Sequence, residues 1–156
     1  MTTPLIKRFH DWLGVWRGPI EWSDGRRGIM EFTFESIFNG QAIEVRTVSF
    51  DSEGAPLTRG WGYLSLDRNG RVIDNIYFSD AGFSVLHEVA DDPGMLSLHG
   101  PLPGNRNLDV AMMVEDDVLA ISSRLGEGYA ASDARPRTFT RMRRIGRSLA
   151  PREEAE

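Results

Sequence analysis

The sequence contains no cysteine in its 156 residues, which excludes disulfide bonds, thiolate nucleophiles and cysteine-ligated zinc or iron–sulfur centres. It has one lysine, Lys7, and three histidines. No apolar run approaches the ~20 residues of a membrane-spanning helix, and the N-terminus has no apolar signal-peptide core. We therefore expect a cytoplasmic protein that does not bind membranes.

Acidic side chains outnumber basic ones, with a net charge of −5, and their distribution is uneven. Residues 1–134 carry 11 basic and 20 acidic side chains, whereas residues 135–156 carry seven arginines and three glutamates. Affinity for nucleic acid depends on clustered lysine and arginine, so this composition argues against a nucleic-acid partner. The basic C-terminal segment either contacts an anion or neutralises the acidic remainder of the chain.

Alternation of apolar and polar residues with a period of two dominates the chain after residue 15. Asn39-Gly40 and Asn69-Gly70 are the strongest hairpin signals, because both residue types tolerate positive φ. Strands are predicted over 16–22, 28–38, 41–50, 57–66, 71–78, 82–90, 94–100, 106–115, 118–125 and 137–145. Without helices between them, neighbouring strands must pair antiparallel, and so many strands close into a barrel or fold into a sandwich. We predict an all-β, antiparallel up-and-down barrel of about ten strands.

One short helix is predicted at the N-terminus, where it would close one end of the barrel. Its signals are a capping threonine, a proline in the first turn and a terminating glycine: Thr2 or Thr3, Pro4 and Gly14. Its apolar face would consist of Leu5, Phe9, Trp12 and Leu13. The chain length predicts a single domain, which we place at residues 1–147, followed by a charged, disordered tail over residues 148–156.

The junction Leu13-Gly14-Val15-Trp16-Arg17-Gly18 joins this helix to the first strand. A short N-terminal helix running into Gly-x-Trp resembles the signature of the calycin superfamily, which includes lipocalins, fatty-acid-binding proteins and nitrobindins. The resemblance covers about residues 5–145 and implies an antiparallel barrel that encloses a ligand cavity. It also implies that Gly14 and Trp16 close one barrel end beneath a basic residue of the last strand, for which we choose Arg141.

Two branches of the superfamily do not fit the sequence. Only about six residues, 23–28, separate the first two predicted strands, too few for the helical lid of fatty-acid-binding proteins, and no helix follows the last strand as in lipocalins. The sequence is most similar to small bacterial ten-stranded barrels of the nitrobindin-like kind. Such barrels can hold heme through an axial histidine near the C-terminal strands, but no histidine follows His99 here. We therefore expect no cofactor, and His87 and His99 are the candidates for a heme or nitrogen-oxide function.

The function we predict first is binding of a small, hydrophobic or amphipathic molecule in the barrel cavity. The candidate lining residues share strand faces with other apolar residues: Phe32, Phe34, Trp61, Tyr63, His87 and Met112. Arg141 and Arg143 would hold a ligand carboxylate if the last strand turns them inward. In the alternative, the aromatic residues fill a solid core, Arg141 only packs over Trp16, and Arg143 lies at the barrel rim or outside. A homodimer is left open.

A small cofactor-free isomerase or cyclase is the third function that the residues allow. Asp74 shares a face with apolar residues of its strand, which indicates an inward carboxylate with a raised pKa. His87 and Tyr77 would complete an acid/base set with Asp74. The alternative is an outward-facing or hydrogen-bonded carboxylate. The sequence has no nucleophile elbow, phosphate-binding loop or His-Glu-x-x-His motif, and its histidine spacing predicts no metal site.

Overall fold

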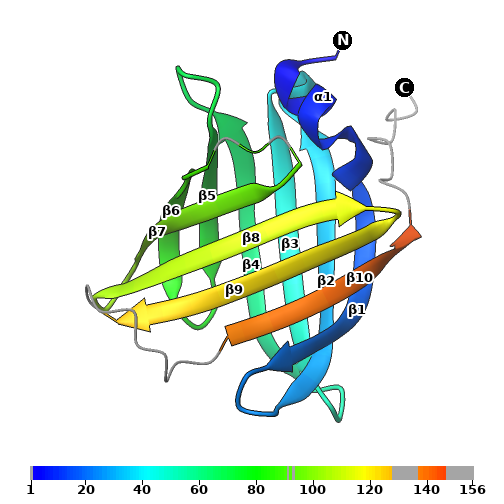
Figure 1. Ribbon diagram of the computed structural model, residues 1–156, viewed down its shortest axis with the longest axis vertical. Helices are drawn as coiled ribbons and strands as arrows, with labels where there is room; N and C mark the ends of the chain where they lie inside the picture. The colour runs from blue at the N-terminus through cyan, green and yellow to red at the C-terminus, as the bar shows by residue number, and fades with distance from the viewer. Residues whose placement is uncertain (1, 91, 93, 128–136, 147–156) are drawn as a thin grey trace, which may run out of the picture.

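The protein is an antiparallel β-barrel with one short helix at its N-terminus. The computed structural model describes residues 2–90, 92, 94–127 and 137–146. Each strand pairs with its neighbours along the chain, and β1 also pairs with β10, so the ten-strand barrel is closed (Figure 1). This confirms the predicted fold class. The elements are α1 Pro4–Phe9, the 3-10 turn η1 His10–Trp12, β1 Gly14–Trp22, β2 Arg27–Ile37, the 3-10 turn η2 Phe38–Gly40, β3 Ala42–Asp51, β4 Pro56–Leu66, β5 Val72–Phe78, β6 Gly82–Glu88, β7 Leu96–Leu102, β8 Arg106–Glu115, β9 Val118–Glu127 and β10 Arg137–Gly146.

The N-terminal helix forms where the sequence predicts it. The Thr3 hydroxyl caps it by accepting a hydrogen bond from the backbone N–H of Ile6 at 3.2 Å, and Pro4 occupies the first turn. Its apolar face and the barrel residues below it form one core cluster that includes Leu5, Phe9, Trp12, Trp16 and Phe34. The helix therefore covers one end of the barrel (Figure 1). Within the described residues, no helix is both long and apolar enough to cross a membrane.

A partly buried ion pair ties this helix to the barrel wall. The guanidinium of Arg8 binds both carboxylate oxygens of Glu88 on β6, and its Nη1–Oε1 distance is 3.0 Å. The backbone N–H of Val72 also donates to Glu88 Oε1 at 3.2 Å. Burial alone would raise the pKa of Glu88, but the hydrogen bonds from Arg8 and Val72 and the positive charge of Arg8 outweigh it, so that pKa lies below its usual value.

Glycine on β4 allows neighbouring backbones to approach closely where the sheet curves. A Cβ added at Gly62 would overlap the carbonyl oxygen of Asn75 on β5, so only glycine fits at this position. A Cβ at Gly60 would be 2.5 Å from the Thr47 hydroxyl and 3.3 Å from the Phe78 ring. The two glycines share the inner face of β4, where a side chain at either position would prevent this close approach.

On three strands the face that points into the barrel is not the face that carries the aromatic residues. On β4 the buried alternation runs through Gly60, Gly62 and Leu64; on β6 it runs through Ser84, Leu86 and Glu88; and on β10 it includes Thr140 and Met142. Hydrogen bonds explain why hydroxyls are inside. The hydroxyls of Ser84 and Thr140 donate to the backbone carbonyls of Pro101 and Pro19. Burying a hydroxyl costs little free energy when it is hydrogen-bonded in this way. A polar residue on a strand therefore does not by itself identify the outer face.

Candidate functional site

The barrel encloses a cavity of about 250 Å³ below the helical cover. β1 begins beside the helix, and its last residue, Trp22, lines the cavity together with Asp80 and Ala81 of the β5–β6 turn. The cavity therefore extends toward the end of the barrel opposite α1. Most of its wall is apolar, and Met30, Phe32, Ile76, Phe78, Leu108 and Met112 contribute to it.

Phe32 and Met112, two of the predicted ligand-binding residues, line this cavity. Phe34 is also inside but lies at the covered end, fully buried, with its ring 5.7 Å from that of Phe32 and 5.9 Å from that of Trp12. Phe34 therefore supports the floor of the cavity, and Phe32 continues the aromatic surface into it. The binding role of these side chains stays a prediction.

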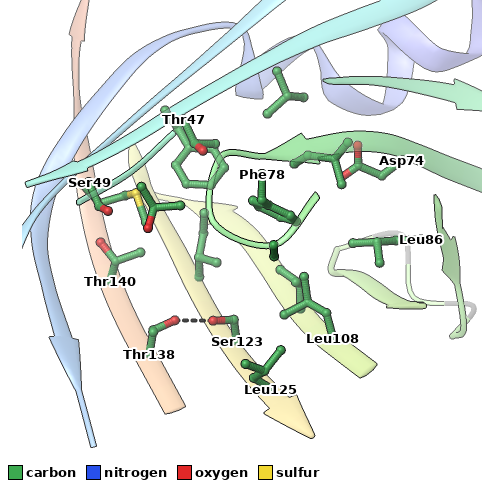
Figure 2. A pocket seen from close by; sticks show the side chains of 18 of the residues that line it. Thr47, Ser49, Asp74, Phe78, Leu86, Leu108, Ser123, Leu125, Thr138 and Thr140 are labelled. Carbon is green, nitrogen blue, oxygen red and sulfur yellow. Dashed lines mark hydrogen bonds between the residues drawn. The ribbon is translucent and has the colours of Figure 1, made fainter. Parts of the chain in front are cut away.

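Hydroxyl groups form a polar strip on one side of the cavity. Figure 2 shows Thr47, Ser49, Thr138 and Thr140 along this side, with Leu86 and Asp74 across from them. Thr138 and Ser123 share a hydrogen bond between their hydroxyls, and Thr140 donates to the Pro19 carbonyl at 2.7 Å. These three hydroxyls are already engaged within the barrel wall. Sequence reasoning missed this strip, and the threonine alternation of β10 was the signal that could have found it.

Asp74 is the buried carboxyl of the cavity. It lies on β5 with 4% of its surface exposed, and in register its neighbours are Leu64 on β4 and Leu86 on β6. Its Oδ1 has no hydrogen-bond partner, and among the buried side-chain atoms of the described residues it is alone in this. Burial among apolar side chains raises the pKa of Asp74 to about 7. The structure thus confirms the inward carboxyl predicted from the alternation of β5. The alternative, a carboxylate satisfied by hydrogen bonds, does not hold for Oδ1.

The predicted acid/base set is not assembled. Tyr77 is 52% exposed on the outer face of β5, and His87 is exposed on the outer face of β6. Neither lines the cavity that holds Asp74, so the proposed cooperation of the three residues is wrong. The alternation on β6 misled the prediction because Phe83 and Val89, which share the face of His87, are exposed apolar residues.

Trp61 and Tyr63 also point outward, which corrects their assignment as cavity residues. Their exposed fractions are 52% and 36%, and Gly60 and Gly62, which alternate with them along the strand, occupy the inner face of β4. Trp61 donates its indole N–H to Glu44 at 3.2 Å and pairs in register with Tyr77 on the next strand. Cross-strand contacts of this kind stabilise the outer surface of a sheet, which explains aromatic residues there.

The histidines do not fit a heme held in the cavity. His87 and His99 are cross-strand neighbours on the outer faces of β6 and β7, and His99 Nδ1 lies 2.6 Å from Asp109 Oδ1. All three histidines of the sequence fall within the described residues, and none of them lines the cavity. An axial imidazole from this chain would have to come from outside the barrel. Within the described part of the chain, no group of three potential ligand residues could hold a metal ion.

Arg144, not Arg141, is the basic residue over Trp16. Its guanidinium lies 4.4 Å from the Trp16 ring centroid, and it also donates hydrogen bonds to the backbone carbonyls of Leu13 and Asp11. Arg141 and Arg143 are exposed on the outer face of β10, so neither reaches a ligand in the cavity. An inward Arg141 and Arg143 would require Phe139, on the same face of β10, to point inward too, whereas Phe139 is 50% exposed. Gly14, with φ of 130°, turns the chain from the helix into β1 just before the buried Trp16.

Neither a protein-family model nor a curated protein sequence matches this chain. Solved structures do resemble it. Rv2717c from M. tuberculosis is 16% identical, with a TM-score of 0.70, and the match covers 92% of this chain and 99% of that one. A designed barrel, EF1p2_mFAP2b bound to DFHBI, is 15% identical with a TM-score of 0.52, covering 90% and 98% of the two chains. These likenesses show the fold alone. That fold is the closed antiparallel β-barrel described above.

Proposed function

We propose that this protein binds a small, mostly apolar molecule in its barrel cavity. The proposal rests on the cavity of about 250 Å³ that remains in the barrel interior beside a well-packed core. This cavity is lined mainly by apolar side chains and is covered at one end by α1. Native cores of this size leave few voids larger than a water molecule, so a cavity of these dimensions needs a reason. Its volume suits a ligand with one or two rings.

The structural likeness to a designed barrel adds support. EF1p2_mFAP2b is described as bound to the small molecule DFHBI, and its similarity to this chain is in the fold. By analogy, a barrel of this architecture can bind a compact ligand. The nitrobindin-like resemblance and a cytoplasmic location remain part of this proposal, whereas a heme function receives no support from the positions of His87 and His99.

A pair of substitutions on β8 tests the proposal. Val110 lines the cavity, whereas its neighbour Ala111 does not. Val110→Trp should fill the cavity, and Ala111→Trp should leave it open. We expect the protein to retain apolar compounds detectable by native mass spectrometry, or to bind members of an apolar panel, and Val110→Trp to lose this binding. If wild-type protein binds no member of a broad panel of lipids and aromatic compounds, the proposal is wrong.

A further inference from the structure

Three charged residues line the cavity in the described part of the chain: Asp74, Asp80 and Arg106. Asp80 is exposed and Arg106 is half-buried, and both lie at the open end, in or beside the turns that follow β5 and β7. Asp74 alone is buried. It lies deeper in the barrel, closer in sequence to the end of β5 that the helix covers.

The surroundings of Asp74 offer it no counter-charge. Its partners on β4 and β6 are Leu64 and Leu86, and the inward residues before and after it on β5 are Val72 and Ile76. Glu88, the next inward residue on β6, has its carboxylate bound by Arg8 and the Val72 N–H. The barrel therefore buries the Asp74 carboxyl and leaves its Oδ1 without a donor, and the residue lines the cavity.

We propose that Asp74 is the recognition group of this cavity and that its ligand is a small apolar molecule carrying a protonated amine. The inference rests on the proposed binding function and specifies its chemistry. A buried carboxylate is costly without a cation, and no described residue supplies one here. An ammonium group in the cavity would supply both the missing charge and an N–H donor to the Asp74 carboxylate, while the apolar body of the ligand would contact the remaining wall.

Release of the Asp74 carboxyl proton on binding distinguishes an ammonium ligand from a neutral one. The pKa of Asp74 is raised to about 7, so near pH 6 its carboxyl is mostly protonated in the empty cavity. A bound ammonium favours the carboxylate, and the carboxyl proton passes to the buffer when the ion pair forms. An alcohol of the same size accepts or donates a hydrogen bond without changing this protonation state.

The experiment compares three probes of matched size: 1-naphthylmethylamine, 1-naphthalenemethanol and 1-naphthoic acid. Binding is measured by calorimetry near pH 6 in two buffers of different ionisation enthalpy, with wild-type protein, Asp74→Asn and Asp80→Asn. We expect the amine to bind about tenfold tighter than the alcohol or more, and to release close to one proton. We expect the naphthoate to bind most weakly, since its own carboxylate would be buried beside Asp74 without a cation to pair with it.

Asp74→Asn should abolish both the amine preference and the proton release while leaving the affinity for the alcohol within about threefold. Asp80→Asn should retain both. Retained alcohol binding by Asp74→Asn also shows that the variant is folded. If the alcohol binds as tightly as the amine, or if Asp74→Asn keeps the preference, the role of Asp74 is refuted and the binding function stands. If none of the probes binds to wild-type protein, the inference is overturned, and the wider ligand panel decides the binding function.

Discussion

Arg144 on β10 covers the indole of Trp16 on β1, with 4.4 Å between its guanidinium carbon and the ring centroid. The same guanidinium donates to the carbonyls of Leu13 and Asp11, while the Trp16 indole N–H donates to the Trp12 carbonyl at 2.8 Å. One side chain thus joins the last strand, the first strand and the turn that ends the helix. It secures the seam at which the barrel closes.

Arg144→Ala should therefore lower the free energy of unfolding by about 2–4 kcal/mol, because it removes the cation–π contact and leaves backbone carbonyls without a donor. Arg141→Ala is the matched control on the same strand, since Arg141 is exposed, and should change stability by less than about 0.5 kcal/mol. Urea denaturation followed by tryptophan fluorescence measures both. Equal effects of the two substitutions would contradict the role assigned to Arg144.

The sequence predicts the positions of the strands better than it predicts which face of each strand points into the barrel. Turn residues such as Asn69-Gly70 and the period of two place the strands within a few residues, because both follow from local backbone preferences. The face that each strand turns inward is a tertiary property. On β10, Thr140 is inside because it bonds to Pro19, and Phe139 is outside; hydrophobicity alone reverses this order.

The Arg8–Glu88 pair should make the helical cover sensitive to acid. The pKa of Glu88 lies below that of an unfolded glutamate, so its contribution to stability is fully present above the unfolded value of 4.5 and is lost as the pH falls through the lower folded value. Glu88→Gln should cost about 2 kcal/mol or more at neutral pH, since Arg8 loses its partner. It should also flatten the acid side of the stability profile.

Glu35→Gln is the control for this measurement. Glu35 pairs with Arg46 at 3.3 Å on the barrel surface, where an ion pair contributes less than about 1 kcal/mol. Circular dichroism during urea denaturation, repeated between about pH 3 and pH 7, gives both profiles. An acid limb that is as steep in Glu88→Gln as in the wild type would show that Glu88 is not the group responsible.

Gly62→Ala should be among the most destabilising small substitutions in the chain. Its new methyl group would overlap the backbone of Asn75, which cannot move without displacing β5. We expect a loss of at least about 3 kcal/mol. Gly126→Ala on β9 meets no atom closer than the Asn107 carbonyl oxygen at 4.0 Å and should be neutral or slightly stabilising. Thermal denaturation of the two variants compares them directly, and similar melting temperatures would count against a close approach at Gly62.

The candidate site was predictable only in part, for a related reason. The inward positions of Asp74 and Phe32 follow from alternation with apolar inward neighbours on their own strands. Trp61, Tyr77 and His87 were misplaced because aromatic residues stabilise either face of a sheet through cross-strand pairs. On β4 the inward residues include two glycines, which have no side chain whose hydrophobicity could indicate burial. A prediction that weighed Gly60 and Gly62 as inward residues would have turned Trp61 and Tyr63 outward.

Asp74 should give the empty protein an unusual dependence on pH. The folded state holds the carboxyl proton up to about pH 7, whereas the unfolded chain releases it near 3.8, so stability should fall as the pH rises between these values and then level off. Each pKa unit corresponds to about 1.4 kcal/mol, and the difference in stability between Asp74→Asn and the wild type should therefore grow by about 4 kcal/mol across this window. Asp80→Asn, an exposed carboxylate at the open end, should show no such growth. Urea denaturation at several pH values tests this without any ligand. A difference that stays constant from about pH 4 to pH 7 would mean that water or a rearranged wall solvates Asp74, and the cavity would then lack the uncompensated carboxyl on which amine recognition depends.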